Sequence, residues 1–513
     1  MTPPLTGPSF TGEVDAVVVG TGAGGAPLAA RLAGAGLSVV MIEAGRHWTP
    51  ARDWATDERA QDALFWNDER LSAGADPVAF GRNNSGIGVG GSTLHYTAYV
   101  PRAQPDDFHL RRDFGVGADW PIGYDDLAPY YAEVEAFLGV SGPSPYPWGP
   151  PRPAYPLPPL PLNGAAELMQ RGCASLGIRT SPAANAAVSR AWQQEGYGLR
   201  PACTNRGFCQ AGCSTGAKAG MDTTYIPLAL ARGAELRTET FVTGIETDGA
   251  GQVTGVVAMH DGAETRQRCR ALFLCAGAIE TPRLLLLNRL GRGPVGHHFM
   301  AHTGVQLWAR FPERVGPTKG IPGGLISEDT HRPDDADFAG GYLLQSIGVM
   351  PVTYASQVAR GRGLWGQAML DHMERFNHVA GINILGDCLP HPENRVELSD
   401  ELDGRGLPKP RIYFTAGENE LRMTAHAERK MRAIFDAAGA RDAWAFPRYA
   451  HIIGTCRMGD GDDAVVDRDG RLHGHSNLVI ADNSVFASAL SCNPALTIMA
   501  NALRTADRFL EAR

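Results

Sequence analysis

Three cysteines lie close together near the middle of the chain, in the segment CTNRGFCQAGC. Cys203, Cys209 and Cys213 fall within eleven positions, and thiols at this density are typical of a metal site, a disulfide or redox chemistry. A disulfide is disfavoured in a reducing compartment unless it is redox-active. The residues alone leave open a metal cluster, a zinc site, and free or disulfide-bonded thiols.

Three histidines form a second candidate site, in the segment VGHHFMAH. His297, His298 and His302 lie within six residues, which by itself would suggest a metal. No carboxylate or cysteine stands at a spacing that completes a zinc site there. We therefore expect no metal at these histidines.

A glycine-rich turn follows the first apolar run, in VVVGTGAGGAPLAARLAGAGLSVVMIEAG. Gly20, Gly22 and Gly25 have the spacing G-x-G-x-x-G. The first glycine permits a tight turn, the second lets backbone amides approach a pyrophosphate, and the third lets a helix pack on a strand. Glu43 ends the second apolar run, where a carboxylate accepts hydrogen bonds from an adenosine ribose. The pattern predicts a dinucleotide site at the start of a helix.

A second glycine-rich stretch, NNSGIGVGGSTLHYTAYVPR, covers residues 83–102. Its backbone amides and hydroxyl groups would suit a second phosphate or an isoalloxazine ring. Taken alone, the stretch fits a flexible loop equally well.

The hydrophobic pattern predicts the elements that position these residues. Residues 15–19 and 38–42 are apolar runs typical of buried parallel strands, with a helical pattern between them. The other predicted elements are paired strands at 235–248 and 253–261, a strand, glycine turn and helix at 270–290, and an amphipathic helix at 419–440 closed by Gly439.

Two further segments carry clear local signals. Residues 142–163 are dense in proline, and we expect an extended strap across the surface, anchored by Tyr146, Trp148 and Tyr155. Near the end of the chain, Asn493 is a natural N-cap and Pro494 a natural first residue of a long final helix.

Composition narrows the class of protein. A chain of 513 residues is long enough for two or more domains. The net charge of −8 argues against nucleic acid or an anionic membrane as the main partner. No apolar run is long enough for a membrane span, and the first residues lack the pattern of a secretory signal. These features predict a cytoplasmic protein without a membrane span.

Motifs along most of the chain resemble those of the glucose–methanol–choline (GMC) flavoprotein oxidoreductases. The resemblance rests on the glycine turn described above and on these ordered blocks: GVGGSTLHYTAYVPR, WPIGYDDLAPYYAEVE, CAGAIETPRLLL, HIIGTCRMG and NLVIADNSVFASALSCNPALTIMANA. Several ordered motifs are far more specific than one. The resemblance implies an α/β fold: a Rossmann-like FAD-binding domain with a parallel sheet, beside an α+β substrate domain with a mostly antiparallel sheet.

The resemblance also implies where each domain and the cofactor contacts lie. The FAD-binding domain would consist of residues 10–110, 200–300 and 440–513, and the substrate-binding domain of residues 111–199 and 301–439. The expected FAD contacts are Gly20, Gly22, Ala23, Gly24, Gly25, Glu43, Ala44, Gly90, Gly91, Ser92, His95, Tyr96, Val242, Ala276, Gly277, Asp482, Asn493 and Pro494.

Two residues are implied to be catalytic. His451 matches the first position of the family's H-x-x-G-T-x-R-M-G block, where the catalytic base lies, and Asn493 matches the second active-site position. Oxidation of an alcohol needs a base for the hydroxyl proton while flavin N5 accepts hydride, and neutral imidazole suits that task. His95 falls where some relatives attach FAD covalently, although we favour a non-covalent His95 facing the flavin. We expect His302 to pack near the cofactor.

The resemblance gives the cysteines a specific alternative. Some bacterial dehydrogenases of the family carry an iron–sulfur cluster on a run like C-x-x-C-G-x-C-x-x-x-C, and here Arg206 stands at the second cysteine. Cys203, Cys209 and Cys213 could hold a three-iron cluster, whereas a four-iron cluster needs another ligand. We predict that the ligand has been lost and that no metal is bound.

Together these observations predict an FAD-dependent dehydrogenase or oxidase that acts on a hydroxyl of a sugar, glycoside, amino sugar or polyol. The external electron acceptor stays open among oxygen, a quinone and a redox protein. Two alternatives remain: a non-oxidative lyase or decarboxylase on the same fold, and an electron-transfer subunit whose working centre is the cysteine run.

Overall fold

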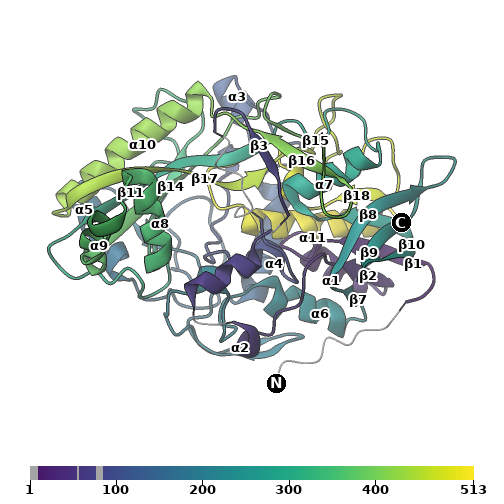
Figure 1. The fold of residues 1–513 in the computed structure, drawn as a ribbon, viewed down its shortest axis with the longest axis horizontal. Coiled ribbons are helices and arrows are strands. Elements are labelled where there is room, and N and C mark those ends of the chain that lie inside the picture. The colour runs from purple at the N-terminus through teal and green to yellow at the C-terminus, as the bar shows by residue number, and fades with distance from the viewer. Residues whose placement is uncertain (1–9, 55–56, 67, 77–84) are drawn as a thin grey trace.

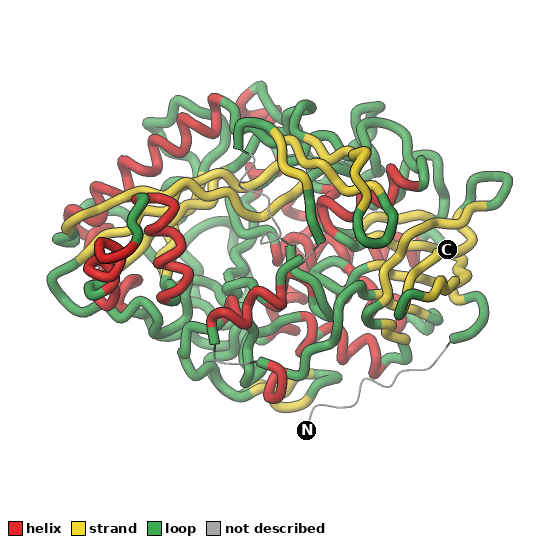
Figure 2. The backbone as a smooth tube through the Cα atoms, viewed as in Figure 1, coloured by secondary structure: helices red, strands yellow, loops and turns green. Residues whose placement is uncertain are grey.

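Two large sheets organise the protein and lie toward opposite ends of the molecule in the view of Figure 1. The computed structural model describes residues 10–54, 57–66, 68–76 and 85–513. Figure 2 shows loops and helices, rather than strands, across much of the space between the two sheets.

The first sheet begins with the expected strand, helix and strand. β1 (Val14–Val19) lies between β2 (Val39–Ile42) and β10 (Ala263–Leu274), and all three run parallel. α1 (Gly25–Gly34) connects β1 to β2 and buries its apolar residues. β1 and β2 are buried throughout, apart from the partly buried Asp15, as continuous apolar runs in a parallel sheet require.

Later segments complete this sheet. β7 (Glu235–Arg237) pairs in parallel with β2, β18 (Leu478–Ile480) pairs in parallel with β10, and β8 (Thr240–Thr247) and β9 (Val253–His260) continue antiparallel from the first half of β10. The predicted pairing of 235–248 with 253–261 is confirmed for β8 and β9, but 235–248 forms two strands rather than one. Glu239 has φ of +51° and breaks the segment, so that β7 and β8 pair with different neighbours.

The second sheet is antiparallel and has six strands. In spatial order they are β17 (Arg441–Ile453), β11 (Met300–Arg310), β14 (Val379–Gly386), β13 (Tyr342–Ile347), β12 (Leu325–Ser327) and β4 (Ser181–Pro182). α5 (Gly164–Ser175) and α10 (Glu418–Ala437) cover one face, where Val305 and Leu307 of β11 join their apolar residues. Figure 1 shows α10 along the outer side of this sheet. α8 (Pro351–Arg362) and α9 (Gly366–Met373) pack at one end.

The remaining elements are smaller or connect the sheets. The other α-helices are α2 (Pro50–Asp53), α3 (Leu110–Phe114), α4 (Tyr124–Leu138), α6 (Tyr225–Ala231), α7 (Gly277–Leu287) and α11 (Ala495–Glu511). The other strands are β3 (Leu71–Ala73), β5 (Trp192–Gln194), β6 (Gly198–Arg200), β15 (Arg395–Leu402) and β16 (Pro408–Tyr413). The 3-10 turns are η1 (Glu58–Leu64), η4 (Gly91–Leu94), η5 (Pro105–Phe108), η6 (Cys209–Ala211), η7 (Met221–Thr223), η8 (Phe376–His378) and η9 (Asn483–Val485).

The predicted N-cap of the last helix is wrong by one residue. Pro494 is the N-cap of α11, whereas the side-chain oxygen of Asn493 accepts a hydrogen bond from Nε2 of Gln345. A side chain held by β13 is not free to cap the helix, so the tertiary contact overrides the local preference.

The proline-rich strap is confirmed as an extended, anchored segment. Residues 142–163 contain no regular helix or strand. Trp148 and Tyr155 are buried, and Nε1 of Trp148 donates to Oδ1 of Asp329 over 2.8 Å.

No helix in the described part of the chain is long and apolar enough to cross a membrane. The domain boundaries given above stay a prediction.

Candidate active site

The glycines of the turn between β1 and α1 have different structural roles. Gly20 has φ of +96°, and a Cβ there would lie 2.4 Å from the carbonyl oxygen of Cys275. A Cβ on Gly25 would lie 2.0 Å from the carbonyl oxygen of Gly20. At Gly22, by contrast, the nearest atom is the Cα of Gly91, 3.8 Å away. Two glycines therefore permit the turn and its packing, and the third leaves open space beside the backbone.

The second glycine-rich stretch meets the first turn. A Cβ on Gly91 would lie 2.9 Å from the Cα of Gly22, and the backbone N–H of Gly90 donates to Oγ1 of Thr21 over 3.3 Å. Two glycine-rich segments thus form one cradle lined by backbone, which fits a diphosphate. Ser92 serves the loop itself, since its hydroxyl accepts from the N–H of Gly86. Residues 83–84, at the beginning of this stretch, lie outside the described residues.

Glu43 joins the two glycine-rich segments. Its Oε2 accepts from the N–H and the hydroxyl of Thr21, at 3.2 and 2.8 Å. Its Oε1 accepts from the N–H groups of Gly45 and Gly88, at 3.0 and 3.2 Å. Burial raises the pKa of this carboxyl, and the hydrogen bonds oppose that rise. The structure therefore assigns Glu43 to holding the cradle, and its contact with a ribose stays a prediction.

Other predicted cofactor residues gather where the parallel strands end. Asp482, two residues beyond β18, accepts the N–H of Gly277 over 2.8 Å and the hydroxyl of Thr281 over 2.6 Å. These two hydrogen bonds join the segments that follow the carboxyl ends of β18 and β10. Parallel sheets bind ligands at this edge. The predicted residues at the ends of β1, β2, β10 and β18 are Gly20, Gly22, Ala23, Gly24, Gly25, Glu43, Ala44, Ala276, Gly277 and Asp482. Val242 lies on β8, whose first residue donates its N–H to the carbonyl of Glu43 over 2.9 Å.

His95 presents a buried ring nitrogen without a partner. Its ring packs against Phe65 with centroids 4.4 Å apart, and its Nε2 has no hydrogen-bond partner among the described residues. Burial, reinforced by the charge of Lys218, lowers the pKa of His95 to about 3, so the ring is neutral. An orphaned polar atom beside the glycine cradle fits a bound cofactor. Tyr96 has a structural contact instead, since its hydroxyl donates to the carbonyl of Ala219 over 2.7 Å.

The cysteine run lies behind the loop that carries His95. Nζ of Lys218 donates to the carbonyl oxygens of Leu94, Tyr96 and Cys209, at 2.7, 3.2 and 2.6 Å. Burial raises the pKa of the Cys209 thiol to about 12, which keeps it protonated and unreactive. The run therefore supports the second glycine-rich loop.

The structure gives no support to a metal in this run. Cys203, Cys209 and Cys213 are free thiols, and within the described ranges no group of three or more His, Cys, Asp or Glu side chains is arranged to hold a metal. No observation on the described residues supports a cluster at these cysteines or an electron-transfer role for this run. His297 and His298 each bond a backbone carbonyl, those of Pro392 and Pro390.

His451 is the extra residue of a β-bulge. β17 pairs with β11 through Ala450 opposite His302 and Ile452 opposite Ala301, which leaves His451 unpaired between them. Its φ is +53°, a left-handed conformation that is uncommon for residues other than glycine and clusters at functional sites. A bulge redirects the side chain of the extra residue, and this one directs His451 toward His302.

The hydrogen bonds of His302 determine where the protons lie on both rings. The two Nδ1 atoms of His302 and His451 are 3.0 Å apart, and the rings are nearly perpendicular. Nε2 of His302 lies 2.9 Å from the carbonyl oxygens of both Ala489 and Leu490. Carbonyl oxygens only accept, so Nε2 of His302 carries the proton and its Nδ1 accepts. His451 must then donate through Nδ1, which leaves its Nε2 as a free base.

Both rings are neutral because of their surroundings. Burial lowers the pKa of His302 to about 4. The pKa of His451 is lowered well below 6.5, first by burial, and the positive charge of Arg448 adds to the effect. A neutral ring with a bare nitrogen is the state that a proton acceptor requires.

Asn493 borders the same face of the antiparallel sheet. Because Gln345 donates to the side-chain oxygen of Asn493, the Nδ2 group of Asn493 remains a donor. Gln345 lies opposite Asn383 of β14, and Asn383 lies opposite Gln306 of β11. Opposite residues point to the same side of a sheet, so these three amides form a row on the face that also carries His302.

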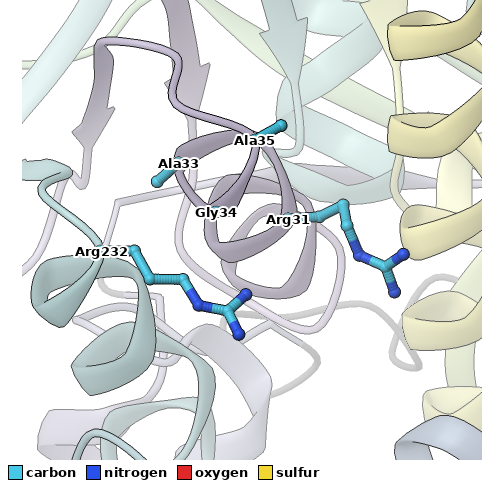
Figure 3. A pocket seen from close by; sticks show the side chains of 5 residues that line it. All are labelled: Arg31, Ala33, Gly34, Ala35 and Arg232. Atoms are coloured by element: carbon cyan, nitrogen blue, oxygen red, sulfur yellow. The ribbon is translucent and has the colours of Figure 1, made fainter.

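A surface pocket lies at the other end of α1 and belongs to neither the cradle nor the histidine pair. It is lined by Arg31, Ala33, Gly34, Ala35 and Arg232 (Figure 3). α1 has ten residues, so its C-terminal end is about 15 Å from the glycine turn. Both arginines have partners: Arg31 pairs with Asp507, and Arg232 donates to the carbonyl of Ala30.

Sequence reasoning missed Lys218, Gln345 and Arg448. Lys218 follows the cysteine run closely in the sequence, and this proximity could have indicated that its side chain contacts the run. Arg448 and His451 are three positions apart, a spacing that puts residues on opposite faces of a regular strand. Only the bulge brings them together.

Comparison with known proteins places these features in a family. Two family models, both described as GMC oxidoreductase, match residues 72–304 and 390–502. The fructose dehydrogenase large subunit of Gluconobacter japonicus is 30% identical over 97% of this chain and 98% of its own length. The 2-methyl-1,2-propanediol dehydrogenase of Mycolicibacterium austroafricanum is 30% identical over 96% and 95%. The solved structure of a formate oxidase has a TM-score of 0.72 at 17% identity, covering 98% of this chain and 99% of that one, and supports the fold.

The family matches include the second glycine-rich stretch of the cradle and the segment that carries His451 and Asn493. The cradle and the orphaned nitrogen of His95 fit the cofactor of that family. The chain therefore belongs to the GMC oxidoreductases, FAD-dependent enzymes that act on the CH–OH group of alcohols, sugars and polyols.

Proposed function

We propose that this enzyme oxidises a hydroxyl group of a sugar, glycoside, amino sugar or polyol to a carbonyl. The observation that carries the proposal is the hydrogen bond between His302 and His451, because it leaves Nε2 of a neutral His451 without a proton. No described residue bonds that nitrogen. FAD, when bound, supplies the acceptor for the hydride of the same carbon.

The two catalytic residues have complementary tasks in this proposal. Nε2 of His451 accepts the hydroxyl proton, and Nδ2 of Asn493 donates a hydrogen bond to the substrate oxygen and orients it. His302 is a positioning residue, since it holds the Nδ1 proton of His451 away from the substrate. Once His451 is protonated, its bond to His302 becomes charge-assisted and stronger.

Two observations support a polyhydroxylated substrate. The relatives described above are named for fructose and for 2-methyl-1,2-propanediol. The side-chain oxygens of Gln306 and Asn383 are buried and have no partner among the described residues, so they are available to accept from substrate hydroxyls. The final electron acceptor is oxygen, a quinone or a redox protein.

Anaerobic mixing with a panel of sugars and polyols tests the proposal. Loss of the oxidised flavin absorbance on mixing is expected for the substrate class and reports hydride transfer directly. His451→Ala should retain FAD and slow flavin reduction by about 100- to 10,000-fold, the usual contribution of a general base. His260→Ala, a change at a part-exposed histidine on β9, serves as the matched control. Near-wild-type reduction by His451→Ala would contradict the proposal.

A further inference from the structure

Arg448 lies beside the proposed base, on the same face of the antiparallel sheet. On β17 it stands opposite Gly304 of β11, and Ala450, two residues on, stands opposite His302. A step of two residues along a strand is about 7 Å, within reach of an arginine side chain. The charge of Arg448 contributes to lowering the pKa of His451, which places the guanidinium near the ring.

The guanidinium of Arg448 has no partner in the part of the chain that the structure describes. No hydrogen bond or ion pair involves it there. Two buried arginines, by contrast, are paired: Arg102 with Glu135 at 2.6 Å, and Arg283 with Asp403 at 2.8 Å. Arg448 is half-buried, and burial lowers its pKa without a carboxylate to offset the effect. A cation that is partly withdrawn from water and has no protein partner gains stability when a ligand of opposite charge binds it.

The groups around Arg448 are those of a binding site. The His302–His451 pair lies on one side along the strands, and the amide row of Gln306, Asn383 and Gln345 lies on the other. Gln306 and Asn383 are 3% and 2% exposed, and their side-chain oxygens are unpaired within the described residues. These oxygens would suit hydroxyl donors, whereas Arg448 requires an acceptor with negative charge.

We infer that Arg448 binds an anionic group of the substrate, a carboxylate or a phosphate ester, near the hydroxyl that His451 deprotonates. The planar fork of arginine matches either anion with two parallel hydrogen bonds. The inference rests on the proposed function and narrows its substrate class to acidic derivatives of sugars and polyols, such as uronic acids or sugar phosphates.

Anion binding to the oxidised holoenzyme tests the site without turnover. Acetate and inorganic phosphate are titrated separately, and a saturable change in the flavin spectrum reports binding; the tighter anion identifies the type of group. Arg448→Gln should weaken this binding about 10- to 100-fold, as loss of a charged hydrogen bond predicts, and Arg448→Lys should weaken it less. Arg441→Gln is the matched control, because Arg441 is exposed at the far end of the same strand.

Reduction kinetics and thermal stability complete the test. Each sugar of the panel is compared with its uronic acid and its phosphate ester, and Arg448→Gln should lower the preference for the acidic form at least 10-fold. The melting temperature of Arg448→Gln should be unchanged or higher, because an unpaired cation is removed. An unchanged preference together with unchanged anion binding would overturn the inference and leave the proposed function standing. Loss of anion binding in Arg448→Gln, with no alcohol reducing the flavin, would instead support the anion site and refute the proposed function.

Discussion

His302 should control the rate of flavin reduction although it does not touch the substrate in our proposal. Phenylalanine at this position preserves an aromatic ring but removes the acceptor for Nδ1 of His451. The Nδ1 proton of His451 would then be free to move to Nε2, the atom that must accept the substrate proton. We expect His302→Phe to reduce the flavin about 10- to 100-fold more slowly than the wild type.

The magnitude follows from the bond between the two rings. A hydrogen bond between neutral groups contributes about 0.5–1.5 kcal/mol, and one to a charged group about 1.5–3 kcal/mol. The bond strengthens as His451 gains the proton, so its loss removes about 1–1.5 kcal/mol from the transition state, or about 5- to 13-fold in rate. Loss of the neutral hydrogen bond, which selects the tautomer of His451, slows flavin reduction by a further factor of about 2 to 13.

Anaerobic stopped-flow reduction separates this effect from substrate binding. The rate constant at saturating alcohol should fall in His302→Phe while the apparent Kd stays within about threefold, which corresponds to less than one hydrogen bond. His302→Asn, which keeps an acceptor on a short side chain, should recover most of the rate. The carbonyl oxygens of Ala489 and Leu490 lose their donor in the phenylalanine variant, so its stability should fall by about 1–3 kcal/mol.

Two results would refute this reasoning. One is a reduction rate in His302→Phe within threefold of the wild type. The other is equal loss in the phenylalanine and asparagine variants, which would show that His302 acts through packing alone.

Three further predictions concern the base, the cradle and the loop support. Because the pKa of His451 lies well below 6.5, the reduction rate should stay level as the pH falls through 6.5; a decline centred at pH 6.5 would contradict the lowered pKa. Gly22→Ala should preserve folding, since the nearest atom is 3.8 Å from the new Cβ, and it should weaken FAD binding as measured by flavin fluorescence. Gly25→Ala should instead lower the melting temperature of the apoprotein, because its new Cβ would lie 2.0 Å from the carbonyl oxygen of Gly20. Lys218→Met leaves three carbonyl oxygens without their donor and should lower the free energy of unfolding by about 2–4 kcal/mol. Cys209→Ala is the control. Equal melting temperatures for the two variants would refute the role of Lys218 in supporting the second glycine-rich loop.

Local sequence was sufficient for the dinucleotide unit. The spacing of Gly20, Gly22 and Gly25 predicts a tight turn from a strand into a helix, and the apolar runs on either side predict β1 and β2. The turn, α1 and the pairing of β1 with β2 all lie within residues 14–42, so one short stretch of sequence contains the pattern that predicts them. The break between β7 and β8 was missed for the opposite reason, because β7 pairs with β2, far away in the sequence.

The site could be predicted only in part. Motif resemblance identified His451 and Asn493, and both border the face of the antiparallel sheet that carries His302. It could not reveal the bulge that redirects His451, nor the bond to His302, 149 residues away. The cysteine spacing allowed a cluster or a disulfide, and the structure shows no disulfide among Cys203, Cys209 and Cys213.

The sequence by itself determined that this chain builds a glycine cradle for a dinucleotide and carries the histidine block of its family. Tertiary structure decided the proton positions on His302 and His451, the engagement of Asn493 by Gln345, and the isolation of Arg448. These properties depend on strand register and on which partners a buried group finds or lacks. Both are set by contacts between distant segments, which no local pattern encodes.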